Sequence, residues 1–429
     1  LVTAPASSPA DAPIPLRVSW DTPGLLPGGR LEGFVLLGDA GSGRTLLRVP
    51  VTLQRSAQTA MAARLLAHGD QLAMRLASGV AAERLAIDVP EGATALRVST
   101  TGSGDLSLFL SRTDTPDGPA IDPAPPREQA VLSATGSGAA RSLEATPANG
   151  LDAGRWYVTP LNTGSTPVEF TLNVELVGST AETPRVGAYF NPQRDGAGAF
   201  LFEAPGSWGL LWYTYLEDGS PTWYIASAPP PAAGQGQWTA DLFRARWNGS
   251  EAPLTDVGEV ILTLDTSDAL QFGWNLEGES GSERYRFIDG GGCALQGGQP
   301  FDINGFWFNP AQPGYGYSVN AFPGVETNGA YFFDDRGIAR WALGAVAPFG
   351  GDTLVFDQRL GSCPACAYAA PTVEAGIGTL VRSYASDGAG QMRLDLELMP
   401  PLSGSWSVDT PVQKLTAANP PLPPPLSEH

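Results

Sequence analysis

The 429-residue chain has few of the residues that catalytic and metal sites most often use. It contains only two histidines, His68 and His429. A Ser-His-Asp triad needs a histidine held by an acid, and His68 lies in an expected surface turn. No HExxH, P-loop or dinucleotide-binding pattern occurs. We therefore expect no catalytic site in this chain. A site made of carboxylates alone stays open, although Glu217-Asp218 and Asp334-Asp335 are expected to be solvated turn residues.

The chain is also poor in lysine and strongly acidic. Lys414 is the single lysine among 25 basic residues, and the formal net charge is −19. Because an acidic chain repels phosphate backbones, nucleic acid is not expected as a partner. No apolar stretch reaches the roughly 20 residues that a transmembrane helix needs. The chain begins with Leu1 and shows no signal peptide, so we expect a mature or excised fragment whose upstream part is missing.

Only three cysteines occur, and two of them are close in sequence. Cys363-Pro-Ala-Cys366 is spaced to close a local disulfide around a turn. A zinc site would need a second ligand pair, and a redox motif would need a βαβ context. We predict a structural disulfide, which fits an oxidising compartment. Cys293 is then expected to be unpaired and buried.

Long periodic helices are scarce, and the composition indicates an all-β chain. Glycine (52) and proline (39) are abundant, but 42% apolar and 9% aromatic residues argue against disorder. Short Val, Leu, Thr and Tyr runs between turn residues predict many strands. One helix is predicted over residues 57–67, where Ala, Met, Leu and Arg favour it.

An internal repeat organises the second half of the chain. Gly187-Ala-Tyr-Phe-Asn-Pro returns 118 residues later as Gly305-Phe-Trp-Phe-Asn-Pro, and an ungapped alignment of 187–225 with 305–343 keeps eleven of 39 residues. Glycine, proline and aromatic residues set turns and cores, so the repeat specifies an architecture more than a chemistry. The shared residues are Gly187/Gly305, Phe190/Phe308, Asn191/Asn309, Pro192/Pro310, Gly196/Gly314, Gly198/Gly316, Pro205/Pro323, Gly206/Gly324, Tyr213/Tyr331, Gly219/Gly337 and Trp223/Trp341.

Three stretches in the first half carry a resemblance to a known family. They are Leu85-Ala-Ile-Asp-Val-Pro-Glu-Gly-Ala, the run from Leu96 to Leu110 with Gly-Asp-x-x-Leu, and Ala153-Gly-Arg-Trp-Tyr-Val-Thr-Pro. Residues 70–178 thereby resemble the bacterial pre-peptidase C-terminal domain, a β-sandwich found beside secreted metallo- and serine peptidases. The only metal ligand that this resemblance suggests is Asp105, for calcium, and Ser107 stands where the family has a second acid. We expect no cofactor, and Asp105 is expected to be a turn or cap residue.

These observations predict an all-β chain made of β-sandwich or barrel-like modules. The first three strand-like runs look like part of an immunoglobulin-like domain, or else pack onto the domain that follows. Both repeats resemble tandem aromatic-rich units in the tails of secreted proteins from high-GC Gram-negative bacteria. The expected divisions are a linker with the partial immunoglobulin-like segment (1–56), the pre-peptidase C-terminal-like sandwich (57–182), the first repeat (183–300), the second repeat (301–417) and a Pro-rich tail (418–429).

Aromatic residues that only one repeat carries are the candidate binding residues. The shared residues are expected to be core, whereas Trp212 and Tyr224 are replaced in the second repeat by Ala330 and Ala342. If such private rings are exposed, they can bind polysaccharide or peptide by stacking; otherwise they pack in the core or between domains. The candidates are Trp212 and Tyr224 in the first repeat, and Trp307, Tyr315 and Tyr317 in the second.

The resemblances together suggest a role without catalysis. We expect the C-terminal accessory region of a secreted bacterial hydrolase, a subtilisin-like serine peptidase, that serves substrate or surface binding, secretion or stability. Its partners would be the upstream catalytic domain or an extracellular polymer of protein or polysaccharide, outside or on the surface of a Gram-negative cell. The alternative is a self-associating subunit of an extracellular fibre or surface layer.

Overall fold

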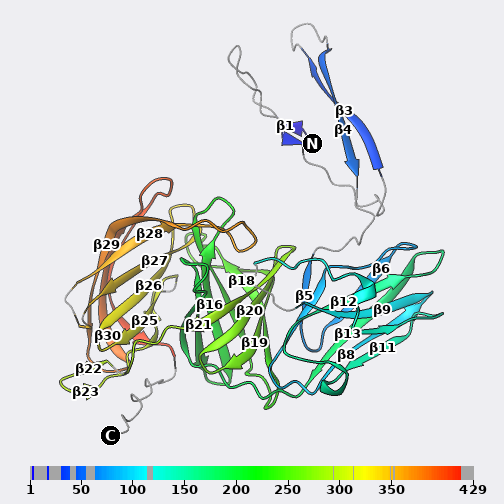
Figure 1. The fold of residues 1–429 in the computed structure, drawn as a ribbon. Coiled ribbons are helices and arrows are strands. Elements are labelled where there is room, and N and C mark those ends of the chain that lie inside the picture. Colours follow the sequence, from blue (N-terminus) through cyan, green and yellow to red (C-terminus); the bar gives the residue numbers. More distant parts are fainter. Residues whose placement is uncertain are drawn as a thin grey trace.

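The computed structural model confirms that the chain is all-β and built from several modules (Figure 1). Cys293 and the expected Pro-rich tail lie outside the part of the chain that is described. The residues that the structure describes are 2–3, 17–18, 30–38, 45–54, 63–113, 119–292, 294–312, 314–347, 349–350 and 353–416.

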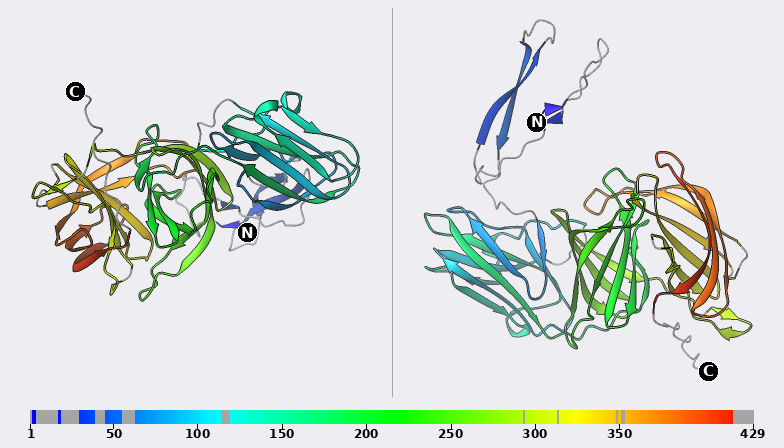
Figure 2. Two further views of the ribbon diagram at one scale, coloured as in Figure 1. Left: turned by 90° about the horizontal axis from the view of Figure 1, so that it is seen from below. Right: turned by 180° about the vertical axis from the view of Figure 1, so that it is seen from behind.

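The first described strands form two small antiparallel pairs. Strand β1 (Val2–Thr3) pairs with β2 (Arg17–Val18), and β3 (Arg30–Gly38) pairs with β4 (Thr45–Gln54). The β3–β4 hairpin stands apart from the other modules in Figure 1 and in the right-hand view of Figure 2.

The next module is a sandwich of two sheets. One sheet has the order β10-β9-β12-β7-β5 and the other β11-β8-β13-β6. Buried residues alternate along β13, where Val168, Phe170 and Leu172 face the core around Trp156. The elements are β5 (Arg64–Leu66), β6 (Gln71–Leu76), β7 (Leu85–Val89), β8 (Ala95–Ser103), β9 (Leu106–Arg112), η1 (Arg127–Gln129), β10 (Leu132–Ala134), β11 (Arg141–Ala145), η2 (Pro147–Asn149), β12 (Gly154–Asn162) and β13 (Val168–Val177).

The helix predicted over 57–67 is wrong where it can be compared. Residues 57–62 lie outside the described part, and Arg64–Leu66 form β5, which pairs in parallel with β7. The side-chain amide of Asn275 accepts a hydrogen bond from the Leu65 N–H at 2.9 Å and donates one to the Leu65 carbonyl at 2.7 Å. These long-range bonds outweigh a local helix propensity of a few tenths of a kcal/mol per residue, roughly.

Each repeat forms a closed eight-stranded antiparallel barrel, in which every strand pairs with the next and the last pairs with the first. Between the two barrels in the sequence, β22 (Leu295–Gln296) and β23 (Gln299–Pro300) form a small hairpin. Barrel 1 consists of β14 (Gly187–Phe190), β15 (Gly198–Ala204), β16 (Ser207–Tyr215), β17 (Pro221–Ala228), β18 (Gln237–Ala245), β19 (Leu254–Thr266), β20 (Ala269–Leu276) and β21 (Glu279–Phe287). Barrel 2 consists of β24 (Gly305–Phe308), β25 (Gly316–Phe322), β26 (Val325–Phe333), β27 (Ala339–Val346), β28 (Thr353–Leu360), β29 (Thr372–Tyr384), β30 (Ala389–Glu397) and β31 (Ser405–Lys414).

The repeated asparagines tie the first strand of each barrel to the last. Asn191 Oδ1 accepts the Gln193 N–H at 2.9 Å, and its Nδ2 donates to Glu283 of β21 at 3.1 Å. In barrel 2, Asn309 holds the same kind of turn and its Nδ2 donates to Thr410 of β31. One side chain thus forms the Asn-Pro turn and supports barrel closure, which explains why both repeats keep it.

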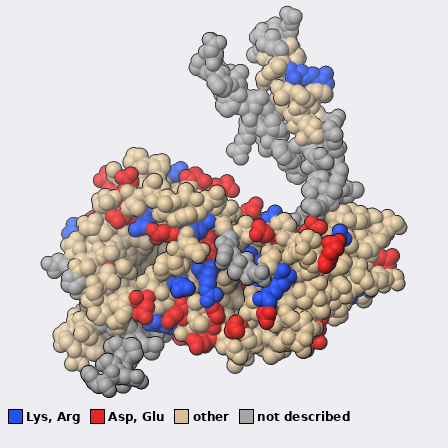
Figure 3. All heavy atoms as spheres, in the orientation of Figure 1, with Lys and Arg blue, Asp and Glu red and all other residues tan. Residues whose placement is uncertain are grey.

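The sandwich and the two barrels lie in a row, with barrel 1 in the middle (Figures 1 and 2). A buried ion pair anchors the sandwich to barrel 1: Asp88 and Arg155 are 3.1 Å apart, and Ser282 of β21 donates to Asp88 at 2.6 Å. Figure 3 shows acidic and basic side chains interspersed over the visible face. No helix in the described part of the chain is long and apolar enough to cross a membrane.

Candidate functional site

The two barrels meet through equivalent surfaces, so that a pseudo-two-fold axis relates the repeats. In each barrel, the loop that joins the fifth and sixth strands contacts the tip of a β-hairpin in the other barrel. The hairpins are β16–β17 in barrel 1 and β26–β27 in barrel 2. The Gly361 N–H donates to the Gly219 carbonyl at 2.9 Å, and the Trp247 N–H donates to the Gly337 carbonyl at 2.9 Å. Gly219 and Gly337 are a repeated pair, and a Cβ on Gly337 would lie 2.0 Å from the Trp247 carbonyl oxygen. This contact therefore requires glycine.

Repeated aromatic rings also cross the interface reciprocally. Tyr213 packs on Trp341 with ring centroids 5.5 Å apart, and Trp223 packs on Tyr331 at 6.5 Å. A tyrosine of each repeat thus meets a tryptophan of the other, which is the pattern of an isologous interface. All four rings are nine-tenths or more buried. These four repeated aromatic residues are core residues as expected, but their core lies between the barrels.

One side of this interface is closely packed, and we call it the closed side. Trp341 Nε1 donates to the Thr214 carbonyl at 2.8 Å. The barrel 2 loop 361–371 covers the rings here, and Arg194 of barrel 1 donates to the carbonyls of Cys363 and Cys366. The predicted Cys363–Cys366 disulfide is formed within this loop.

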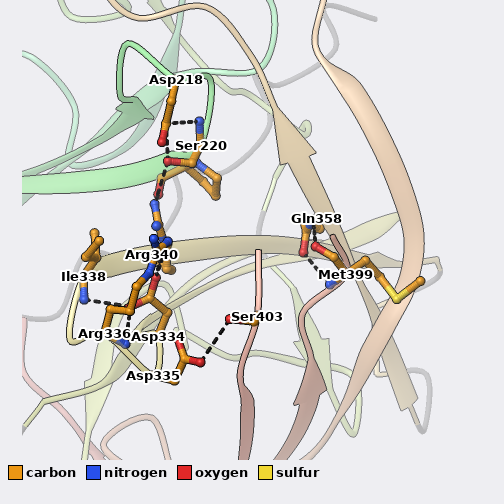
Figure 4. A network of polar contacts seen from close by, with 11 residues as sticks. Asp218, Ser220, Asp334, Asp335, Arg336, Ile338, Arg340, Gln358, Met399 and Ser403 are labelled. Atoms are coloured by element: carbon orange, nitrogen blue, oxygen red, sulfur yellow. Dashed lines mark hydrogen bonds and ion pairs between the residues drawn. The ribbon is translucent and has the colours of Figure 1, made fainter. Parts of the chain in front are cut away.

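A buried charge network also joins the hairpins of the two barrels (Figure 4). Arg340 of barrel 2 donates to Ser220 Oγ at 2.8 Å and to the Pro221 carbonyl at 2.9 Å, both in barrel 1. Its guanidinium also binds Asp334, 2.9 Å away. Asp334 was expected to be a solvated turn residue, and that expectation is wrong. Its side chain is 1% exposed, because it accepts hydrogen bonds from two turn N–H groups as well as from Arg340.

The opposite side, which we call the open side, contains an apolar cleft of about 500 Å³. The barrel 1 loop on this side, residues 246–253, is shorter than loop 361–371 and covers less of the aromatic surface. The cleft is lined by Phe202, Leu211, Trp223, Ile225, Ala226, Ser227, Phe243, Ala245, Ala252, Leu254, Phe306, Trp307, Phe308, Gly314, Tyr315, Gly316, Tyr331, Phe333 and Leu415.

The lining of the cleft is apolar and uncharged. None of the described residues that line it is charged, so it holds aromatic and aliphatic surface without an acid or base. Tyr331 OH pairs with Ser318 Oγ at 2.9 Å, and burial raises the pKa of Tyr331 far above its ordinary value. Leu254 and Leu415 are 52% and 48% exposed at the cleft. A cleft of this size and lining suits a small apolar ligand or a few residues of a polymer.

The five candidate binding residues have different positions. Trp212 and Tyr224 are each 2% exposed inside barrel 1, so of the two alternatives, exposure or packing in a core, the structure shows packing in a core. Tyr317 is fully buried inside barrel 2. Trp307 contributes to the cleft wall but is also fully buried, whereas Tyr315 lines the cleft and is partly exposed. The cleft thus brings together Trp307 and Tyr315 only.

Sequence reasoning did not show that a shared core ring also borders a cleft. Trp223 is buried, as expected for a residue that recurs as Trp341, and it also lines the open cleft. The sequence did contain a signal for a surface common to both repeats. Glycine and aromatic residues recur together in the two segments that form the β-hairpins. The repeat alone does not say which copy is covered and which is open.

Other candidate residues have structural roles. Asp105 is exposed, and its carboxylate accepts the Gly138 N–H at 2.8 Å. His68 lies in a turn and its Nδ1 accepts the Leu176 N–H at 3.1 Å. Burial raises the pKa of Glu283, although Asn191 and Arg194 bind its carboxylate. Within the described ranges, no group of three or more His, Cys, Asp or Glu residues is arranged to hold a metal ion.

Comparisons with family models and with curated proteins do not identify a family for this chain. The chain matches no family model, and no curated protein matches it significantly.

Proposed function

We propose that this chain is the non-catalytic accessory region of a secreted bacterial hydrolase, a subtilisin-like serine peptidase, and that it attaches the enzyme to its substrate or to a surface. The observation that carries the proposal is the uncharged aromatic cleft on the open side. Concave apolar sites with a few polar groups are the usual form of ligand sites, and exposed apolar surface of this kind marks interaction sites. The resemblance of residues 70–178 to a peptidase-associated domain supports the choice of parent enzyme.

The cleft can be tested by making it charged. Leu254→Asp with Leu415→Asp places two carboxylates at its partly exposed rim, where the fold tolerates them. Val381→Asp is the matched control, because Val381 is 48% exposed in β29 and is not among the cleft residues. Retention on insoluble protein and polysaccharide should fall for the double variant and persist for the control. Equal retention of all three proteins, or turnover of hydrolase substrates by the chain alone, would contradict the proposal.

A second candidate function is self-association into a fibre or surface layer. The observation that favours it is the β3–β4 hairpin, in which Phe34 and Leu36 are 52% and 59% exposed on one face. An apolar two-stranded hairpin is a template for pairing with another chain. Sedimentation velocity at increasing concentration should show oligomers that Phe34→Ser with Leu36→Ser abolishes. A chain that stays monomeric throughout would exclude this function.

A further inference from the structure

A second cleft between the barrels has a different lining from the apolar cleft, and we call it the polar cleft. Its volume is about 790 Å³, and it adjoins the apolar cleft at Phe333, which lines both. Barrel 1 contributes residues of the loop 246–253 and Thr255. Barrel 2 contributes the tip of the β26–β27 hairpin and residues 404–406 at the start of β31. The polar cleft is therefore built by both barrels together.

Two tryptophans, one from each barrel, give the polar cleft aromatic surface. Trp247 of barrel 1 stacks on Phe333 with ring centroids 6.2 Å apart. Trp406 of barrel 2 packs on Phe332 at 6.2 Å and on Tyr315 at 5.5 Å. Both tryptophans line the cleft and are partly exposed. Trp406 Nε1 is buried, so this residue offers ring surface and no donor. Packing against neighbouring rings holds both indoles in place before any ligand binds.

Hydrogen-bonding side chains line the same cleft. Arg246 and Arg336 are exposed, and so is Asp335, whose carboxylate accepts a hydrogen bond from Ser403 Oγ at 3.0 Å (Figure 4). The Arg246 side chain makes no hydrogen bond or ion pair with any residue that the structure describes. Ser405 adds an exposed hydroxyl. The cleft thus offers donors and acceptors beside aromatic surface.

This combination favours a saccharide as the ligand. A hydroxyl both donates and accepts hydrogen bonds, and the apolar face of a sugar ring packs on an aromatic ring. A lipid chain would desolvate the charged side chains without giving them partners. A peptide cannot join either barrel as an added strand, because every barrel strand is already paired on both sides. The net charge of −19 repels nucleic acid and acidic saccharides, which leaves a neutral saccharide.

We propose that the polar cleft binds a neutral saccharide chain, with sugar rings packed on Trp247 and Trp406 and hydroxyls bonded to Arg246, Arg336 and Asp335. This inference rests on the proposed function and specifies a ligand for it, at a cleft other than the apolar one. Each barrel supplies one of the two tryptophans. The pairing of the repeats therefore creates a site that neither barrel contains alone.

The test measures the binding of hexasaccharides to the full chain by isothermal titration calorimetry. Cellohexaose, chitohexaose and laminarihexaose are the neutral probes, and hexagalacturonate is the acidic probe. At least one neutral probe should bind. Hexagalacturonate should bind at least about tenfold more weakly than that probe, because the acidic chain repels it.

Variants of the two rings test the stacking contacts. Trp247→Leu and Trp406→Leu each replace an aromatic ring with an aliphatic side chain. Each should weaken the neutral probe about tenfold, the factor for one lost aromatic contact. Thermal unfolding of each variant confirms that it is folded.

Variants of exposed polar residues test the hydrogen bonds without changing a packed ring. Arg246→Ala with Asp335→Ala should weaken the neutral probe at least about tenfold, because hydrogen bonds to charged groups are the stronger ones. Arg393→Ala with Asp409→Ala is the matched control. These two residues are exposed on neighbouring strands of barrel 2, outside the polar cleft, and their removal leaves the net charge equally unchanged. The control should keep the wild-type affinity.

The outcomes separate this inference from the proposed function. Binding of a neutral probe that the ring and polar variants weaken, and that the control keeps, supports the inference. Binding of hexagalacturonate alone, or neutral binding that the polar-cleft variants leave unchanged, overturns it. If no saccharide binds, the inference fails, but retention on insoluble protein that depends on the apolar rim would keep the proposed function. Without either kind of binding, both fail.

Discussion

Trp341 Nε1 donates a hydrogen bond to the Thr214 carbonyl oxygen, 2.8 Å away, and so joins barrel 2 to barrel 1. Trp223 stands at the equivalent position of the first repeat, where the bond is not made among the described residues. The two tryptophans are related by the repeat and both are buried. They therefore form a matched pair in which the same substitution removes a bond in one case only.

This pair gives a prediction for stability. Trp341→Phe removes a donor and leaves the Thr214 carbonyl without that bond, which should lower the free energy of unfolding by roughly 1–2 kcal/mol beyond the loss of ring volume. Trp223→Phe loses a similar ring volume but also removes an unpartnered N–H, so it should cost clearly less. Urea unfolding of both variants measures the difference. Equal losses would show that the interbarrel bond contributes nothing.

The Arg340 network gives a second prediction. Arg340 and Asp334 are each 1% exposed at their side chains, whereas Arg336, which approaches the same carboxylate at 3.6 Å, is 58% exposed. Arg340→Met leaves a buried carboxylate without its main counter-charge and should lower the free energy of unfolding by about 3–5 kcal/mol. Arg336→Ala should cost less than about 1 kcal/mol, because exposed pairs are weak. Denaturant unfolding tests this order, and a reversed order would contradict it.

Local signals in the sequence predicted a large part of the fold. Among the short apolar runs between turn residues, Leu211–Leu216 and Thr222–Ile225 flank an Asp-Gly turn, which is a specific hairpin signal. Residues 211–215 and 222–225 lie in β16 and β17. The Cys363–Cys366 disulfide follows from spacing and is confirmed. Such features need only a few neighbouring residues.

The site depends on information that local patterns do not contain. Both faces of β16 are buried: Trp212 points into barrel 1, while Tyr213 and Tyr215 face barrel 2. Alternation assigns residues to two faces but cannot say which face lies inside a barrel when both are apolar. The cleft also depends on the loop 246–253 being too short to cover it, which only the assembled barrels reveal.

A third prediction concerns pH. Burial raises the pKa of Glu283 above the ordinary value of 4.5, with Asn191 and Arg194 acting in the opposite direction. A carboxyl whose pKa is raised on folding stabilises the fold below its unfolded pKa and loses that contribution as pH rises through the folded pKa. Glu283→Gln removes the titration. The unfolding free energy of this variant, relative to wild type, should therefore increase from about pH 4.5 toward neutrality.

The measurement is urea unfolding of both proteins at several pH values across that window. Glu217→Gln removes an exposed carboxylate from a hairpin turn and controls for the change in net charge. If the relative stability of Glu283→Gln instead falls as pH rises, the ion pair with Arg194, 3.4 Å away, dominates over burial.

A fourth prediction concerns the rings that differ between the repeats. Trp212 of barrel 1 faces Ala199 across the β15–β16 pair, and both lie in the barrel interior. At the equivalent positions of barrel 2, Tyr317 faces Ala330. Each barrel thus places one large and one small residue at this pair, on opposite strands. These aromatic residues differ between the repeats because the large and the small side chain of the pair have exchanged strands within the barrel interior. In the aligned sequences each ring therefore has no aromatic counterpart at the same repeat position.

Exchanging the pair in barrel 2 tests this explanation. Ala330→Trp alone adds a large ring beside Tyr317 in a filled interior and should cost about 1–3 kcal/mol or more. Tyr317→Ala alone leaves a cavity and should cost roughly 3–5 kcal/mol. The double variant recreates the arrangement of barrel 1, so its loss should be well below the sum of the two single losses, with a coupling of about 1 kcal/mol or more. Urea unfolding of the four proteins completes this double-mutant cycle. Additive losses would mean that the two side chains do not share one space, and that the second barrel fills its interior by a different packing.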